Sequence, residues 1–84
     1  MAYRITYKKS VHKDLAHLGS ADARRVIARI EKALAERADA CPVLKGEFAG
    51  LRKLRVGDFR VIYAIVGGDV LIVRIGHRRE VYRR

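Results

Sequence analysis

The spacing of the hydrophobic residues changes twice along this chain, and these changes restrict the fold more than any other feature. Residues 3–7 alternate between apolar and polar, and residues 11–34 repeat apolar side chains at intervals of three and four. From residue 51 the interval returns to two, and residues 59–66 then form a long apolar segment. An interval of two is typical of a half-buried strand, whereas intervals of three and four are typical of an amphipathic helix. The order of strand, helices and strands therefore predicts an α+β fold.

The middle of the chain is predicted to form two consecutive helices joined by Gly19. Ser10 is the predicted N-cap of the first helix and Ser20 that of the second, since a serine hydroxyl can accept a hydrogen bond from an amide of the first turn. Pro42 stops the second helix, because proline cannot continue the hydrogen-bond ladder. The apolar side chains expected to face the core are Val11, Leu15, Leu18, Val26, Ile27, Ile30, Ala33 and Leu34.

Residues 51–75 are predicted to form an antiparallel meander of three strands. Glycine-rich turn sequences at residues 57–58 and 67–69 separate the three segments, and two-residue turns that begin with glycine are typical of hairpins. In the first strand, apolar and basic side chains alternate, so we expect them on opposite faces of the sheet. The apolar pair is Leu54 and Val56, and the basic pair is Lys53 and Arg55.

Together these elements predict a single domain over residues 1–84. One four-stranded sheet, antiparallel throughout, with the helical hairpin packed on one face is the simplest arrangement that buries the apolar side chains. A chain of this length buries about 60–65% of its unfolded surface. We therefore expect marginal stability unless a partner adds further burial.

Basic residues greatly outnumber acidic ones. The chain has 19 lysines and arginines against nine acidic residues, which gives a net charge of +10. The excess is densest from residue 51 onward, where nine basic residues, eight of them arginine, stand against three acidic ones. The planar guanidinium of arginine matches the oxygens of a phosphate group. The composition therefore predicts a polyanionic partner rather than a membrane surface, which usually requires a basic amphipathic helix.

The number of cysteines and the spacing of the histidines argue against a metal site. Cys41 is the only cysteine, which excludes an internal disulfide and fits a reducing, cytoplasmic compartment. His12 and His17 are five residues apart, a spacing unlike that of zinc ligands on a helix. The longest apolar run, residues 61–66, is too short to span a bilayer. We expect no metal and no cofactor, so any cleavage of a phosphodiester would proceed without them.

The residue types present are compatible with metal-free cleavage of RNA. This reaction requires a base for the 2′-hydroxyl proton, cations for the charge that builds on the phosphate, and an acid for the leaving 5′-oxygen. Histidine titrates near neutrality, and a lysine can act as a base where burial and nearby positive charge lower its pKa. The candidate residues are Lys53, Arg55, Arg60, His77, Arg78 and Tyr82.

Each of these candidates also has a purely structural interpretation. Lys53 and Arg55 fit the solvated face of an amphipathic strand, and Tyr82 fits a core position. Arg60 lies at the start of the most apolar strand, where a cation is costly unless it has a partner, and the structural interpretation is an ion pair with Asp58 or Glu80. Composition and spacing alone leave these alternatives open.

Two segments of the C-terminal half resemble a known family. Residues 51–63, LRKLRVGDFRVIY, and residues 75–82, IGHRREVY, are similar to the C-terminal signature of RelE-type toxins in the RelE/ParE superfamily. Residues 3–5, residues 13–15 and the pair Lys45-Gly46 are similar too, so the resemblance covers essentially the whole chain. It implies a ribosome-dependent mRNA endonuclease that inhibits translation by 2′-hydroxyl attack. It also implies a co-encoded acidic antitoxin, through which alone the pair would contact operator DNA.

The resemblance assigns roles to individual residues. Lys53 matches the lysine proposed as general base, and Arg60 matches an arginine that stabilises the phosphate. Arg78 matches the arginine proposed as general acid, and Tyr82 matches a stacking or orienting tyrosine. Arg55, Arg52, Arg79 and Arg83 are expected to add contacts to RNA phosphates.

One position departs from the family pattern. RelE members typically carry a further lysine two residues before the position of Lys53, and this chain has Leu51 there. His77, which lies within the same signature, is therefore an alternative base. Two other functions stay open: a ParE-like inhibitor of DNA gyrase without nuclease activity, and an inactive module that only binds its antitoxin or nucleic acid.

Overall fold

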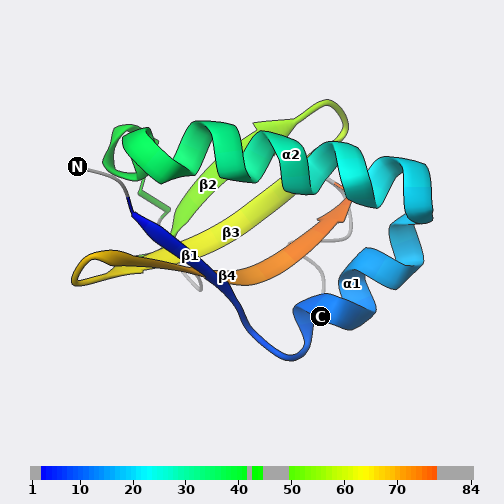
Figure 1. The fold of residues 1–84 in the computed structure, drawn as a ribbon, viewed down its shortest axis with the longest axis horizontal. Coiled ribbons are helices and arrows are strands. Elements are labelled where there is room, and N and C mark those ends of the chain that lie inside the picture. The colour runs from blue at the N-terminus through cyan, green and yellow to red at the C-terminus, as the bar shows by residue number, and fades with distance from the viewer. Residues whose placement is uncertain (1–2, 42, 45–49, 78–84) are drawn as a thin grey trace.

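The computed structural model describes residues 3–41, 43–44 and 50–77. The predicted α+β order is confirmed, and Figure 1 shows the long helix lying across one face of the sheet. The elements are β1 (Arg4–Tyr7), α1 (Val11–Leu18), α2 (Ser20–Arg37), the 3₁₀ turn η1 (Ala38–Ala40), β2 (Arg52–Val56), β3 (Phe59–Val66) and β4 (Asp69–His77).

The four strands form one mixed sheet in the order β1-β4-β3-β2. The predicted antiparallel meander of β2, β3 and β4 is confirmed. The expectation that the whole sheet is antiparallel is wrong, because β1 runs parallel to β4, with Arg4 opposite Asp69 and Tyr7 opposite Ile72. The two helices form a long crossover that carries the chain from β1 at one edge to β2 at the other, which is the connection that strands of the same direction need.

Gly19 ends the first helix where the sequence predicts, but neither predicted serine N-cap is observed as expected. Gly19 adopts a φ of 88° between the helices and ends α1 as predicted. Ser20 is the first residue of α2 and Gly19 occupies the N-cap position, so the predicted cap is off by one residue. Ser10 occupies the N-cap position of α1 but makes no capping hydrogen bond. Its backbone is helical, with φ −62° and ψ −20°, whereas a capping residue is usually extended.

The core lies between the helices and one face of the sheet. Three residues of the predicted stripe of α2, Val26, Ile30 and Leu34, are fully buried and Ala33 packs against them, whereas Ile27 is only half-buried and lies outside the core. Leu54 and Val56 are buried on the same side, as predicted. The side chains of the core are Val11, Val26, Ile30, Leu34, Ala38, Leu54, Val56, Val61, Tyr63, Val70, Ile72 and Ile75.

Hydrogen bonds from the sheet fix both helices. The Tyr63 hydroxyl donates to the carbonyl of Ala38, just beyond the end of α2. The Asp14 carboxylate on α1 accepts a hydrogen bond of 3.0 Å from the backbone amide of Ile75 on β4. The last carbonyls of a helix have no partner within it, so such bonds determine where the helix end lies on the sheet.

Burial also makes the stability of the fold depend on pH above neutrality. It raises the pKa of Tyr63, and burial together with the charge of Glu31 raises the pKa of Tyr7. Both tyrosines stay protonated in the folded protein at a pH where they ionise in the unfolded chain. Their stabilising contribution is therefore complete below the unfolded pKa of about 10 and is lost as the pH rises above it.

Replacing Tyr63 with phenylalanine should test this dependence. At about pH 8 the variant should lose about 1–2 kcal/mol of unfolding free energy, because the Ala38 carbonyl loses its donor. The difference between the two proteins should shrink above about pH 10, since only the wild type loses stability through Tyr63 ionisation. Urea unfolding followed by circular dichroism measures both values. A difference that stays constant with pH would contradict the prediction.

Within residues 3–41, 43–44 and 50–77, no helix is both long enough and apolar enough to cross a bilayer.

Candidate nucleic-acid interface

Four basic side chains gather on the sheet face opposite the helices. Leu54 and Val56 point to the core, so strand alternation places Lys53 and Arg55 on the other face. The register then puts Arg55 opposite Arg60, and it puts Lys53 and Arg74 on either side of Ile62. Here these four cations, Lys53, Arg55, Arg60 and Arg74, are called the basic cluster.

Arg60 lies at the centre of the basic cluster. It is directly opposite Arg55 on β2, and it is diagonal to Lys53 on β2 and to Arg74 on β4. Residues directly opposite have Cβ atoms about 4.5–5.5 Å apart, and diagonal neighbours lie within about 7–8 Å. Gly76 occupies the remaining position opposite Arg60. The central arginine therefore has cations on both neighbouring strands.

Ile62 forms an apolar centre for the basic cluster. It is fully buried, although it is not part of the core beneath the helices. Lys53 and Arg74 flank it on the neighbouring strands, so their aliphatic stems are positioned to cover it while their charged ends reach outward. A charged group beside an apolar surface is less well solvated, which strengthens its interaction with an anion.

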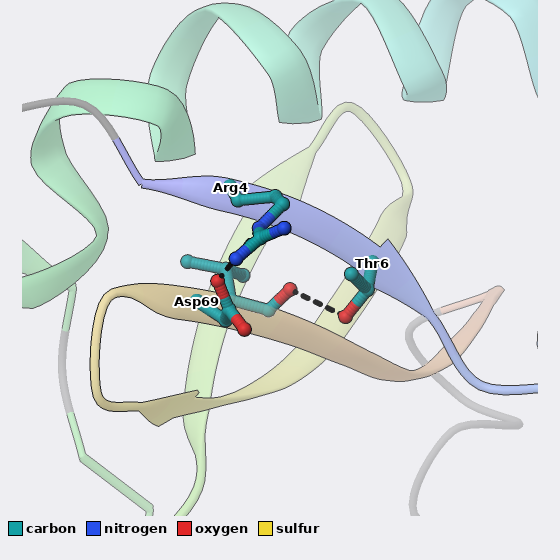
Figure 2. A network of polar contacts seen from close by, with 4 residues as sticks. Arg4, Thr6 and Asp69 are labelled. Atoms are coloured by element: carbon teal, nitrogen blue, oxygen red, sulfur yellow. Dashed lines mark hydrogen bonds and ion pairs between the residues drawn. The ribbon is translucent and has the colours of Figure 1, made fainter.

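The strands that carry the basic cluster contain few carboxylates within the residues that the structure describes. Asp69 is the one acidic residue within β2, β3 and β4, and its carboxylate accepts a hydrogen bond of 3.1 Å from Arg4 on β1. Figure 2 shows this pair at the β1–β4 edge, next to the bond from the Thr6 hydroxyl to the Val70 carbonyl. Neither Lys53 nor Arg55 forms an ion pair with a residue that the structure describes.

The charge of the basic cluster favours the binding of an anion. Several cations on one surface produce a local positive potential that attracts a polyanion. A phosphate on this face could accept charge-assisted hydrogen bonds from these side chains.

Comparison with known proteins places the chain in a family. Residues 5–82 match the family model of the ParE toxin of the type II toxin–antitoxin system parDE. The chain belongs to the ParE toxin family. The predicted resemblance to the RelE/ParE superfamily is thereby confirmed. The search of curated proteins finds no match.

Several solved toxin–antitoxin complexes have the same fold as this ParE-family toxin. The RelBE2 complex from Mycobacterium tuberculosis is similar with a TM-score of 0.78 and 23% identity, over 93% of this chain and 100% of that one. The archaeal RelE–RelB complex from Pyrococcus horikoshii has a TM-score of 0.68 and 30% identity, over 95% and 99% of the two chains. The chromosomal ParDE system from P. aeruginosa has a TM-score of 0.71 and 18% identity, over 90% and 96%. The similar structures thus include both RelE and ParE proteins.

The structure of this ParE-family toxin brings together three of the predicted site residues, Lys53, Arg55 and Arg60. Arg52 lies apart from them, because its guanidinium donates hydrogen bonds of 3.1 and 2.7 Å to the carbonyls of Asp39 and Cys41. These carbonyls follow α2, so Arg52 holds the end of the helical layer. The predicted residues Arg78, Arg79, Tyr82 and Arg83 lie outside the described residues.

His77 also lies apart from the basic cluster. It is opposite Phe59, and the two rings form an edge-to-face contact with centroids 6.2 Å apart. Phe59 packs against the core, so His77 lies on the helix side of the sheet. The structure therefore separates Lys53 and His77, the two candidate bases, onto opposite faces.

Arg74 is the member of the basic cluster that the sequence analysis missed. Val70 and Ile72 point to the core, and simple alternation would place residue 74 beside them. A β-bulge at Ile62/Tyr63 shifts the register, so that the next core residue is Ile75. The same shift moves Arg74 onto the face of the basic cluster and His77 off it. Bulges often re-aim side chains in this way near functional sites.

Proposed function

We propose that this toxin is a metal-independent endoribonuclease that cleaves mRNA on the ribosome and so inhibits translation. The observation that carries the proposal is the basic cluster, in which Arg60 has cationic neighbours on both adjacent strands. Such an arrangement can surround one phosphodiester with positive charge, and stabilising developing charge is the largest single contribution in many enzymes.

The proposed reaction uses the RNA's own 2′-hydroxyl as nucleophile. Lys53 accepts the hydroxyl proton, the 2′-oxygen bonds to phosphorus, and the bond from phosphorus to the 5′-oxygen breaks. Arg60 and Arg55 stabilise the negative charge on the non-bridging oxygens. The leaving 5′-oxygen takes a proton, for which the family pattern assigns Arg78, and Tyr82 would stack on a base.

Primer extension on an mRNA under translation tests this proposal directly. Purified toxin added to a translating extract should produce cuts within codons. A parallel assay of DNA supercoiling by gyrase should be unaffected. Absence of cuts in an extract that continues to translate would overturn the nuclease proposal.

The family match favours a second candidate function, inhibition of DNA gyrase. The matching model is that of the ParE toxin, and a ParDE system is among the similar structures. In this case the basic cluster would bind a protein or DNA surface and no RNA would be cut. The same pair of assays separates the two functions, since supercoiling would then be inhibited and the mRNA left intact.

We also propose an acidic antitoxin as the cytoplasmic partner of this toxin. Several of the similar structures are complexes of a toxin with its antitoxin, and a net charge of +10 favours an acidic segment in the partner. Contacts with operator DNA would be made by the antitoxin. Such a partner would add the buried surface that an 84-residue chain needs.

Binding of the isolated toxin to single-stranded RNA should weaken steeply as salt increases. Four cations that contact phosphates predict a slope of about −3 in a plot of log affinity against log salt concentration, because each contact releases counterions. Fluorescence anisotropy with a labelled RNA of about ten nucleotides measures this slope. A slope near zero would contradict phosphate binding by the basic cluster.

A further inference from the structure

We infer that Arg74 contacts the RNA backbone at the phosphate next to the scissile one. The RNA strand would then lie across β2, β3 and β4, with the scissile phosphate near Arg60 and its neighbour near Arg74. This inference rests on the proposed nuclease function and adds to it the extent of the bound RNA and the residue that holds it beyond the cleaved bond.

The position of Arg74 within the basic cluster supports this assignment. Lys53 and Arg55 lie on β2, and Arg60 lies on β3. Arg74 is the basic side chain that β4 adds, on the side of Arg60 away from the other two. Strands are about 4.7–4.9 Å apart, so the backbones of Lys53 and Arg74 are separated by about 10 Å. The fully buried Ile62 lies between them.

The absence of a side chain at Gly76 on β4 also supports an RNA strand that runs from β2 across β3 to β4. Gly76 is opposite Arg60, so no side chain from β4 stands in the row of Arg55 and Arg60. A backbone held by these two arginines can therefore continue over Gly76 toward β4. Arg74 is two residues from Gly76 on the same face, where its guanidinium can form a bidentate contact with the next phosphate.

The bulge is a second, independent observation. Regular alternation would turn residue 74 toward Val70 and Ile72 in the core, where a cation is costly. The register shift at Ile62/Tyr63 instead returns Ile75 to the core and leaves Arg74 beside the other cations. The register shift therefore places a fourth cation beside Arg60, on the sheet face that the proposed RNA strand crosses.

Arg74→Gln tests the inference, because glutamine keeps a polar side chain and removes the charge. The probe is a seven-nucleotide RNA with a 2′-deoxy nucleotide at the cleaved position, and binding is measured by fluorescence anisotropy at several salt concentrations. The variant should bind about tenfold more weakly, and its salt slope should fall by about 1. Arg29→Gln, which removes an exposed arginine on α2, should bind as the wild type does.

A modified RNA locates the contact. When the phosphate next to the scissile one is replaced by an uncharged methylphosphonate, wild type and Arg74→Gln should bind equally well. If the variant binds the unmodified RNA with wild-type affinity and slope, the inference is wrong even though the nuclease proposal stands. If it loses affinity only for the antitoxin, Arg74 contacts protein instead. A wild type that neither binds nor cuts RNA overturns the proposed function itself.

Discussion

Replacing Arg60 with alanine should lower the rate of mRNA cleavage by on the order of 10²-fold or more. Arg60 lies between Arg55, Lys53 and Arg74, so it is the side chain that can reach a phosphate at the centre of the basic cluster. The charge on that phosphate increases in the transition state, and a preorganised guanidinium stabilises this state more than the ground state. Initial rates from primer extension on translated mRNA give the comparison.

The fold of the Arg60→Ala variant should be intact. Arg60 lies on the sheet face away from the helices, so its truncation leaves the core side chains in place. Arg29→Ala, an exposed cation on α2, lowers the net charge equally and should cleave at the wild-type rate. Equal losses in the two variants would mean that total charge, and not the basic cluster, determines activity.

The element order and the faces of β2 could be predicted because they depend on local spacing. Leu54 and Val56 are buried while Arg55 is exposed, as alternation requires. The same alternation places Arg52 on the helix side of the sheet, because it is two residues from Leu54. The expectation that Arg52 contacts RNA together with Lys53 and Arg55 is therefore inconsistent with the alternation of the strand. The direction of β1 could not be predicted, because the choice of β4 as its partner depends on contacts between residues more than sixty positions apart.

The composition of the candidate site depends on one irregularity that leaves no clear signal in the sequence. The bulge at Ile62/Tyr63 inverts the alternation of β4 beyond Ile72. A regular strand would have put His77 with the cations and Arg74 in the core. The family resemblance identified Lys53 and Arg60, which lie before the bulge on β2 and β3, and it did not include Arg74. Register shifts of this kind follow from the packing of the whole sheet.

The separation of Lys53 from His77 leads to the second large expected effect. Lys53→Met should reduce cleavage by about 10²–10⁴-fold, the usual contribution of a general base. Methionine keeps an unbranched stem of similar length at the position opposite Ile62 and removes the amine. His77→Asn should reduce cleavage by less than about tenfold, because His77 contacts Phe59 on the helix side of the sheet and a base must reach the hydroxyl that it deprotonates.

The pH dependence of cleavage distinguishes the two bases further. If His77 is the base, His77→Asn should change the pH profile of cleavage, because the group that accepts the proton is then missing. If Lys53 is the base, the pH profile of His77→Asn should follow that of the wild type, and only Lys53→Met should change it. Single-turnover rates on translated mRNA between about pH 6 and 9 cover both cases. A severe loss in His77→Asn together with an active Lys53→Met would place the reaction on the helix side of the sheet and separate the basic cluster from catalysis.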